Sequence, residues 1–480
     1  MTAPAAMRRV PRRLLLTLKL GEVPEHLPGI RAVHGYGTAP AEYVDHGVID
    51  RLLRHHGGAF RAARLHSARK RRAESRATGA RRFDDVEQIS GVARVLRIEV
   101  REPERMPALL RALAELPIVE RVGADYLSYT PLDRDGQAGG RGSAAQSWAR
   151  EAIRLPQALQ LEPGDPAVVI GLADTGAALG HVELSGRIRT GFDSVDLDPE
   201  AVGGLTLVGD FRHRGERPQD EVGHGSGCAG ILVARGRDIP AGGAGACGLT
   251  PVRVLGAALG PGDKRIGVGA LDNIDAGMKR LIDLGVKVIN MSFGTPESAL
   301  LADAPRPHEE IVRYALARGV ILVAASGNSG LREKFYPAAH AEVVAVGAVD
   351  ERLLPTSFTT SGEHVALCAP GRDIRTCALD GYQNATGTSF AAPFVSAACA
   401  LLASRAARRA WPLDGALARQ LLIDSARPFA GAGASGYGRG VLDVAAALRA
   451  LDDYIDAQVR AEGDDADIDS DEVPPVPAAA

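Results

Sequence analysis

The feature that most limits the fold is a series of short apolar segments, rich in Val, Ile and Ala, that alternate with helix-prone segments from residue 167 onward. These segments lack the polar alternation of a strand with one solvated face, so both of their faces must be buried. Such strands, separated by helices, predict an α/β fold: a mostly parallel sheet with helices on both faces. The strands are expected at 167–173, 252–255, 286–291, 320–325 and 343–349, and the helices at 224–234, 271–284, 309–317, 389–404 and 413–425.

The sequence around this region divides into further parts. Residues 1–130 contain strands expected at 14–20, 95–100 and 119–129 and a helix at 102–116, which form a small α+β domain. A basic stretch, about 39–92, is expected as an insertion in that domain. Residues 131–147 have the Gly, Ala and Ser content of a flexible linker, and 148–452 form the sheet domain. The acidic and then Pro/Ala-rich residues 453–480 are expected to be disordered.

Charge and cysteine content limit the partners. The run 51–82 is basic, with Glu74 as its one carboxylate, and it indicates either a solvated stretch or a nucleic-acid module. The first is the commoner case, so nucleic acid is not expected as a partner. The five cysteines are an odd number without metal-binding spacing. No segment reaches the roughly 18 apolar residues of a membrane span, and 14–20 is a poor secretory signal, so we expect a cytoplasmic protein.

Four polar residues lie at predicted strand ends or helix starts. Asp174 ends the first strand and is followed by Thr-Gly, while Asn328 follows the strand at 320–325. His224 begins a helix within Gly-His-Gly-Ser-Gly, and Ser389 begins another within Gly-Thr-Ser-Phe-Ala-Ala-Pro. In an open parallel sheet the carboxyl ends of the strands meet at one edge, where ligands bind. The four side chains are therefore expected to lie together.

Each of these residues alone has an ordinary explanation as a helix cap, a turn residue or a structural histidine. Together they supply a nucleophile, a base, an orienting carboxylate and an oxyanion donor. Asp-Thr-Gly also occurs in aspartic proteases, but that chemistry needs two such carboxylates, and the chain has no second Asp-Thr-Gly or Asp-Ser-Gly. The chain order of Asp, His and Ser differs from that of the α/β-hydrolases.

About three fifths of the chain, from about residue 146 to 448, resembles a subtilisin-type serine peptidase. The resemblance rests on several separate motifs: Ile-Gly-Leu-Ala-Asp-Thr-Gly at 170–176, His-Gly-Ser at 224–226, Val-Ile-Asn-Met-Ser-Phe-Gly at 288–294, Ala-Ala-Ser-Gly-Asn at 324–328, Val-Gly-Ala-Val-Asp at 346–350, Ala-Pro-Gly at 369–371, Gly-Thr-Ser-Phe-Ala-Ala-Pro at 387–393 and Tyr-Gly-Arg-Gly at 437–440.

The resemblance implies a serine endopeptidase that acts on proteins or peptides without a cofactor in its chemistry. Ser389 would attack the peptide carbonyl, His224 would take its proton, and Asp174 would orient the imidazole. The Asn328 amide, with the Ser389 N–H, would bind the oxyanion. Water would then hydrolyse the acyl-enzyme.

The same resemblance implies where a substrate binds. One side of its backbone would pair with Ser292, Phe293 and Gly294, and the other with the stretch at about 256–260. Ala325 and Ser326, which follow Ala324, would form the floor of the pocket for the side chain before the cleaved bond.

The resemblance also allows a structural calcium ion and a reactive cysteine. The calcium would draw on Gln146, Glu183 and Asp238, although the loop 235–246 lacks the asparagine that the family uses. Cys228 lies where some relatives carry a free cysteine beside the catalytic histidine. It is interpreted as either a target for thiol reagents or a packed, unreactive residue, with the second more common.

The amino-terminal part, most clearly 112–129, resembles the propeptide of these peptidases. The resemblance implies a zymogen in which residues 1 to about 145 act as an intramolecular inhibitor that is cut within 129–145. An alternative function is a catalytically silent, peptide-binding scaffold of the same fold. A third interpretation treats the basic amino-terminal stretch as a nucleic-acid module.

Overall fold

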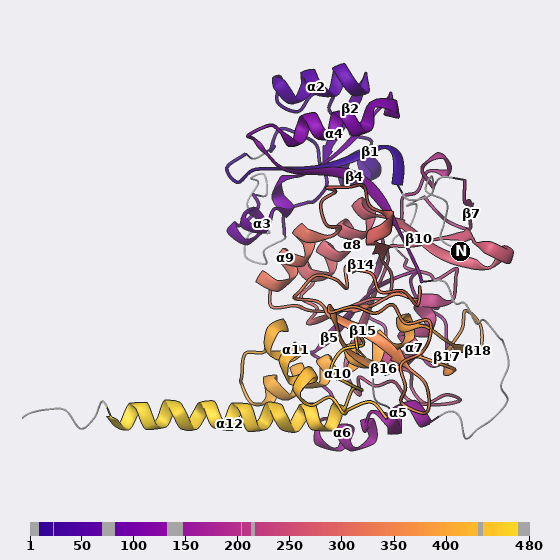
Figure 1. Cartoon of the computed structure of the whole chain (residues 1–480), viewed down its shortest axis with the longest axis vertical. Helices are drawn as coiled ribbons and strands as arrows, with labels where there is room; N and C mark the ends of the chain where they lie inside the picture. The colour runs from indigo at the N-terminus through magenta and orange to yellow at the C-terminus, as the bar shows by residue number, and fades with distance from the viewer. Residues whose placement is uncertain are drawn as a thin grey trace, which may run out of the picture.

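The structure of the chain is a computed structural model. It describes residues 9–22, 24–69, 82–131, 147–202, 204–212, 217–430 and 435–468. Two parts are stacked along the long axis of the molecule (Figure 1). We call residues 9–131 the amino-terminal domain and residues 147–468 the main domain. The predicted linker lies almost entirely outside the described residues.

The main domain is built on a seven-stranded sheet in which every neighbouring pair is parallel. In spatial order its strands are β16 (Val365–Pro370), β15 (Val344–Val349), β13 (Ile321–Ala325), β11 (Val288–Met291), β5 (Val169–Asp174), β8 (Gly248–Arg253) and β6 (Phe192–Asp193). The predicted α/β class with a mostly parallel sheet is confirmed. Five of these strands match the predicted segments, whereas β16 and the short β6 were not predicted.

Helices cover both faces of this sheet. One face packs against α7 (His224–Val233), α10 (Thr388–Arg408), α11 (Gly415–Asp424) and α12 (Val444–Ile468), and the other against α8 (Leu271–Asp283) and α9 (Glu309–Ala317). Alternation within one strand shows the division: Leu172 belongs to the first core, and its neighbour Ala173 belongs to the second. Because both faces are dry, the strands read as continuous apolar runs.

Helix α10 is the one described helix that is long and apolar enough to cross a membrane. Of its most apolar stretch, 83% is buried inside the molecule. That burial is the pattern of a helix in a protein core.

The amino-terminal domain contains a four-stranded antiparallel sheet in the order β2-β3-β1-β4. Helices α2 and α4 pack together on its outer side, and α8 and α9 of the main domain lie on its other side (Figure 1). The bounds are β1 (Arg9–Leu18), β2 (Phe60–Arg64), β3 (Val95–Val100), β4 (Val119–Tyr129), α1 (Ile30–Tyr36), α2 (Val48–Gly57), α3 (Asp85–Ser90) and α4 (Met106–Ala114).

The strand β4 joins the two domains. At its carboxyl end it pairs antiparallel with β10 (Arg265–Ala270), which continues into β9 (Gly256–Leu259) and β7 (Thr206–Val208). The remaining described helices and paired strands are α5 (Trp148–Ala152), α6 (Leu155–Leu161), β12 (Thr295–Pro296), β14 (Phe335–Tyr336), β17 (Ile374–Cys377) and β18 (Tyr382–Ala385).

The interpretation of about 39–92 as an insertion is wrong for its described part. Strand β2 pairs with β3 over five residues, and Ile49 and Leu53 of α2 are fully buried in the domain core. Because this stretch is rich in basic residues, its amphipathic helix and edge strand were not recognised in the sequence. The described part of the stretch thus belongs to the domain, while 70–81 lie outside the described residues.

The prediction of a disordered tail from 453 is wrong as far as Ile468, where α12 ends. Leu451 and Ile455 are buried, and arginines of α10 pair with acidic side chains of α12. Arg405 binds Asp452 at 2.9 Å, and Arg409 binds Asp456 at 2.5 Å. The far end of α12 extends beyond the body of the molecule (Figure 1), and 469–480 lie outside the described residues.

Candidate active site

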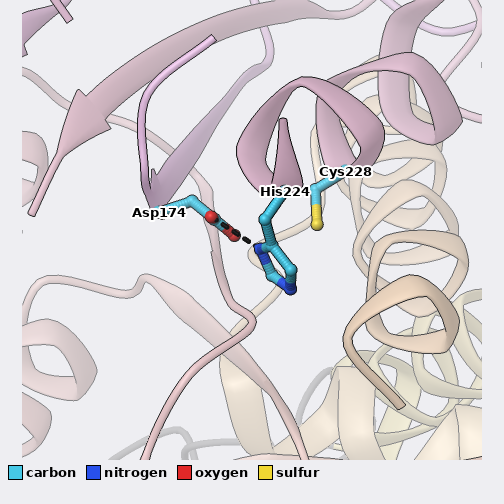
Figure 2. Close-up of side chains that lie close together, drawn as sticks. All are labelled: Asp174, His224 and Cys228. Carbon is cyan, nitrogen blue, oxygen red and sulfur yellow. Dashed lines mark hydrogen bonds and ion pairs between the residues drawn. The ribbon is translucent and has the colours of Figure 1, made fainter. Parts of the chain in front are cut away.

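Asp174 and His224 are joined by a hydrogen bond at the edge of the central sheet. Asp174 ends β5 and is fully buried, and His224 is the first residue of α7. The distance from His224 Nδ1 to Asp174 Oδ1 is 2.8 Å, and the same oxygen accepts the Thr175 N–H at 2.7 Å (Figure 2). The buried carboxylate thus fixes the orientation of the imidazole.

Two glycines allow the start of α7 to pack closely against the loop after β5. Gly223, the residue before the helix, has a left-handed φ of 96°. A side-chain carbon on Gly225 would lie 2.1 Å from the carbonyl oxygen of Gly176. No larger residue fits at this contact, so the Gly-His-Gly sequence is what brings the helix start close to Asp174.

A second buried carboxylate, Asp220, holds these two segments together. It was not among the predicted site residues. Its Oδ1 accepts the Thr175 hydroxyl at 2.8 Å and the N–H groups of Val222 and Gly223. Its Oδ2 accepts both the N–H and the hydroxyl of Ser226, at 2.8 and 2.6 Å. Asp220 therefore ties the β5 loop to the first turn of α7. The signal was an aspartate just before a helix amino terminus, where carboxylates are favoured.

Ser389 lies in the first turn of α10 and is almost fully buried. Its carbonyl oxygen accepts the Ser292 hydroxyl at 2.8 Å and the Cys228 thiol at 3.4 Å. Its own hydroxyl donates to the Ser292 carbonyl oxygen at 3.4 Å. The ring of the next residue, Phe390, lies 5.2 Å from the His224 ring. These contacts bring Ser389 into the same corner as His224.

Asn328 is held by the start of the same helix. Its Oδ1 accepts the N–H of Thr388 at 2.9 Å and the Thr388 hydroxyl at 2.8 Å. With the amide oxygen engaged in this way, the NH₂ group of Asn328 is the end left to donate elsewhere. Thr388 therefore acts as a positioning residue that sequence reasoning missed, although it sits beside Ser389 in the motif.

Cys228 lies close to Asp174 and His224, and the three ligand atoms fall within 4.8 Å of one another (Figure 2). Burial, followed by the nearby Asp174 carboxylate, raises the pKa of the Cys228 thiol well above its ordinary value. A metal or a thiol reagent needs the thiolate form. The protonated thiol instead donates to the Ser389 carbonyl, which fits the interpretation of Cys228 as a packed, unreactive residue.

The end of β4 lies beside the residues predicted to bind substrate. Tyr129 and Gly294 exchange both backbone hydrogen bonds, at 3.2 and 3.1 Å, and Thr130 N donates to the Gly267 carbonyl at 3.0 Å. Phe293 is fully buried beneath this pair. Ala325 and Ser326 are also fully buried, at the end of β13.

The predicted second side of the cleft, about 256–260, is wrong. The strand that pairs with the end of β4 is β10, whereas β9 lies one strand farther out. A hairpin after Leu255 returns the chain to the cleft as β10. The Gly-Pro-Gly at 260–262 marks the turn but does not determine which arm of the hairpin pairs with β4.

Comparison with known proteins agrees with this geometry. Residues 165–446 match the Subtilase family of peptidases. The chain belongs to the subtilase family. It is 30% identical over 333 residues to the thermophilic serine proteinase of Bacillus sp. (strain AK1), a match that covers 68% of this chain and 72% of the relative.

Other relatives of this subtilase are also peptidases. It is 32% identical to thermitase of Thermoactinomyces vulgaris over 55% of this chain and 84% of thermitase. The solved structure of the epidermin leader peptide processing serine protease of Staphylococcus aureus shares the fold, with a TM-score of 0.56 and 22% identity, over 74% of this chain and 90% of that chain. The chain is therefore a subtilisin-type serine peptidase, a hydrolase of a family that needs no cofactor for catalysis.

The residues proposed for the calcium site of this subtilase do not fit a cation. Glu183 is fully buried, and its carboxylate accepts N–H groups of Gly236, Arg237 and Asp238 at 2.7–3.1 Å. A calcium site needs oxygen atoms turned inward, and this loop turns its N–H donors inward instead. The Asp238 carboxylate accepts the Tyr382 hydroxyl at 2.7 Å, and Gln146 lies outside the described residues.

The loop is thus held by Glu183 itself. Burial alone would raise the pKa of Glu183, but the backbone N–H donors outweigh it and hold the pKa below its usual value. The assignment of these residues as calcium ligands is therefore corrected: the Glu183 carboxylate is engaged by backbone N–H groups.

Proposed function

We propose that Asp174, His224 and Ser389 form the catalytic triad of this subtilase. His224 takes the Ser389 hydroxyl proton as the oxygen attacks a peptide carbonyl, and Asp174 holds the imidazole in the tautomer that accepts it. The proton then passes to the leaving amine, and water hydrolyses the acyl-enzyme. The observation that carries the proposal is the 2.8 Å bond between His224 Nδ1 and the buried Asp174, which leaves Nε2 as the proton acceptor.

The oxyanion is proposed to bind two donors. One is the Ser389 N–H in the first turn of α10, where backbone N–H groups are free of intrahelical bonds. The other is the NH₂ group of Asn328, whose oxygen is fixed by Thr388. Donors that are already oriented stabilise the charge without reorganisation during the reaction.

The amino-terminal domain is proposed to hold the enzyme as a zymogen. The end of β4 lies between β10 and Gly294 as an added strand, which is the mode in which a peptide substrate would bind. A substrate cannot pair with the same N–H and carbonyl groups while β4 occupies them. Buried ion pairs between the domains support this placement, including Arg13 with Asp272 at 2.8 Å and Lys279 with Glu87 at 2.7 Å.

A fluorophosphonate probe tests the triad. The full chain is treated before and after limited proteolysis that removes the amino-terminal domain, and the modified residue is located by mass spectrometry. We expect a label on Ser389 that Ser389→Ala abolishes and that the control Ser357→Ala, at an exposed serine, retains. Absence of labelling in both forms of the wild type would instead favour the catalytically silent scaffold.

A further inference from the structure

The end of β4 has a defined register relative to Ser389. Tyr129 and Gly294 donate to and accept from each other, so they are a hydrogen-bonded pair of an antiparallel ladder. In such a ladder the next hydrogen-bonded pair lies two residues farther along each chain. Continued by this rule, the register would pair Pro131 with Ser292. The carbonyl group of Ser292 lies next to the Ser389 hydroxyl, at 3.4 Å from its oxygen, so the register brings Pro131 to the nucleophile.

Proline is the one residue that leaves this pair incomplete. A residue at position 131 would donate its N–H to the Ser292 carbonyl oxygen, but proline has no N–H. The Ser389 hydroxyl donates to that oxygen instead. The Ser389 hydroxyl proton is therefore directed to the Ser292 carbonyl oxygen. The end of β4 lacks the N–H bond at Pro131 that would hold the Pro131 carbonyl carbon in place for attack.

We propose that Pro131 protects the amino-terminal domain from the chain's own active site, so that the domain is an inhibitor presented like a substrate but cut slowly. This inference rests on the proposed triad and on the proposed occupation of the cleft. The step that is slowed is attack of Ser389 Oγ on the Pro131 carbonyl carbon. In that step the C–N bond after Pro131 breaks, and the serine proton passes through His224 to the released amine.

The register of β4 limits how the enzyme could be activated. A cut elsewhere in the predicted window, 129–145, requires that another position reach Ser389 or that a second molecule make the cut. While Tyr129 and Thr130 stay paired with Gly294 and Gly267, the register allows only the bond after Pro131. Release of the amino-terminal domain thus depends on loosening this strand and not on the intrinsic reactivity of the triad.

The test compares self-cleavage of full-length chains. Wild type, Pro131→Ala and Pro131→Leu are incubated at several protein concentrations, and the new amino terminus is identified by mass spectrometry. Restoring one backbone hydrogen bond should speed the cut after residue 131 about tenfold in both variants, which corresponds to about 1.4 kcal/mol. The rate should not depend on concentration, because the reaction is intramolecular. Pro117→Ala, at an exposed proline of the same domain, should behave as wild type.

Other outcomes overturn the proposal in distinguishable ways. Equal rates after residue 131 in wild type and Pro131→Ala would show that the missing N–H is irrelevant. Acceleration in Pro131→Leu alone would show that the side-chain pocket sets the rate. If neither variant is cut but the fluorophosphonate probe still labels Ser389, this inference fails while the triad stands. If Ser389 is not labelled either, the proposed function fails with it.

Discussion

The amino-terminal domain meets the main domain through two contacts of different chemistry. The inner face of its sheet and its helix α3 rest on α8 and α9 through ion pairs: Glu87 of α3 with Lys279 and, from the sheet, Arg13 with Asp272, Arg121 with Glu309 and Glu120 with Arg313. The end of β4 enters the cleft through backbone hydrogen bonds of Tyr129 and Thr130. We call these the charged contact and the cleft contact.

The two contacts differ in chemistry, and we infer that they serve different purposes. In the charged contact, Lys279 and Glu87 are almost fully buried, and two desolvated charges tolerate only a partner of the right sign in the right place. In the cleft contact the groups are backbone atoms that every non-proline residue carries. We therefore expect the charged contact to determine which domain docks and the cleft contact to block the substrate. Three predictions test this division, from the largest expected effect to the smallest, and a fourth concerns a site outside both contacts.

The largest effect is expected from Lys279→Met. It leaves the Glu87 carboxylate buried without its cation, and breaking such a pair costs about 3–5 kcal/mol. Urea denaturation of the full chain should show the loss, and peptide hydrolysis should rise as the amino-terminal domain dissociates. The matched control is Lys279→Met with Glu87→Gln, which should recover much of the stability because residue 87 is then uncharged, while Asp283, the other carboxylate paired with Lys279, is partly exposed. Equal losses of stability in the single and double variants would show that the unpaired Glu87 charge is not the cause.

Acid should weaken the charged contact through His66, which lines a small cavity together with residues of both domains. Burial, then the nearby Lys279, lowers the pKa of His66 to about 3. The neutral ring therefore contributes stability that is complete above the ordinary pKa of about 6.5 and is lost as the pH falls from there toward 3. At pH 5 the loss should be about 2 kcal/mol, from about 1.4 kcal/mol per unit.

The measurement is the urea midpoint at pH 5 and pH 7 for wild type and for His66→Gln. The variant cannot take up the proton, so its midpoint should fall much less on acidification. The same fall in both chains would show that another group dominates the acid response.

A smaller effect is expected from Ser128→Val in the cleft contact. The Ser128 and Thr295 hydroxyls are buried and lie 2.9 Å apart, and the Thr295 hydroxyl also reaches the Leu127 carbonyl at 3.3 Å. Losing one neutral hydrogen bond costs about 1 kcal/mol. The backbone bonds of β4 remain, so the domain should still inhibit, with a modest rise in basal hydrolysis. Adding Thr295→Val should cause only a small further loss, because the bond between the two hydroxyls is already gone and only the 3.3 Å bond from Thr295 to the Leu127 carbonyl remains to be lost. Basal hydrolysis in the double variant as high as in Lys279→Met would show that the two contacts do not differ.

The smallest effect is expected from calcium removal, outside both contacts. Glu183 already receives the loop's N–H donors, so EDTA should leave the melting temperature of the full chain unchanged within error at neutral pH. Glu183→Ala removes the acceptor and should lower the melting temperature with or without calcium. A fall with EDTA in wild type that calcium reverses would show an ion site at other residues.

Local pattern was sufficient for the five inner strands of the central sheet and for the four residues of the candidate active site. Strands buried on both faces read as continuous apolar runs, and a parallel sheet brings their carboxyl ends to one edge whatever the loops do. Asp174 at the end of β5 and His224 at the start of α7 therefore had to meet near that edge. The helix at 309–317 and the strand at 119–129 were predicted to the residue, since their apolar spacing and end signals agree.

Contacts between distant segments were not contained in that pattern. Charge misled at 453–468, because the partners of Asp452 and Asp456 are arginines of α10 some 40 residues earlier. It misled again at 39–92, where a basic surface covered a buried strand pairing. The calcium ligands failed for a similar reason, since whether a loop offers carbonyls or N–H groups to Glu183 depends on its backbone torsions and not on its composition.

The sequence by itself determined the subtilase fold, the order of the catalytic groups and the resemblance of the first domain to an inhibitor. Only the tertiary structure decided which strand borders the cleft, that Asp220 and Thr388 hold the site in place, and that Tyr129 pairs with Gly294. The physical reason is that apolar periodicity fixes an element and its buried faces locally, whereas register and hydrogen-bond direction are fixed only when two segments far apart in the chain are placed side by side.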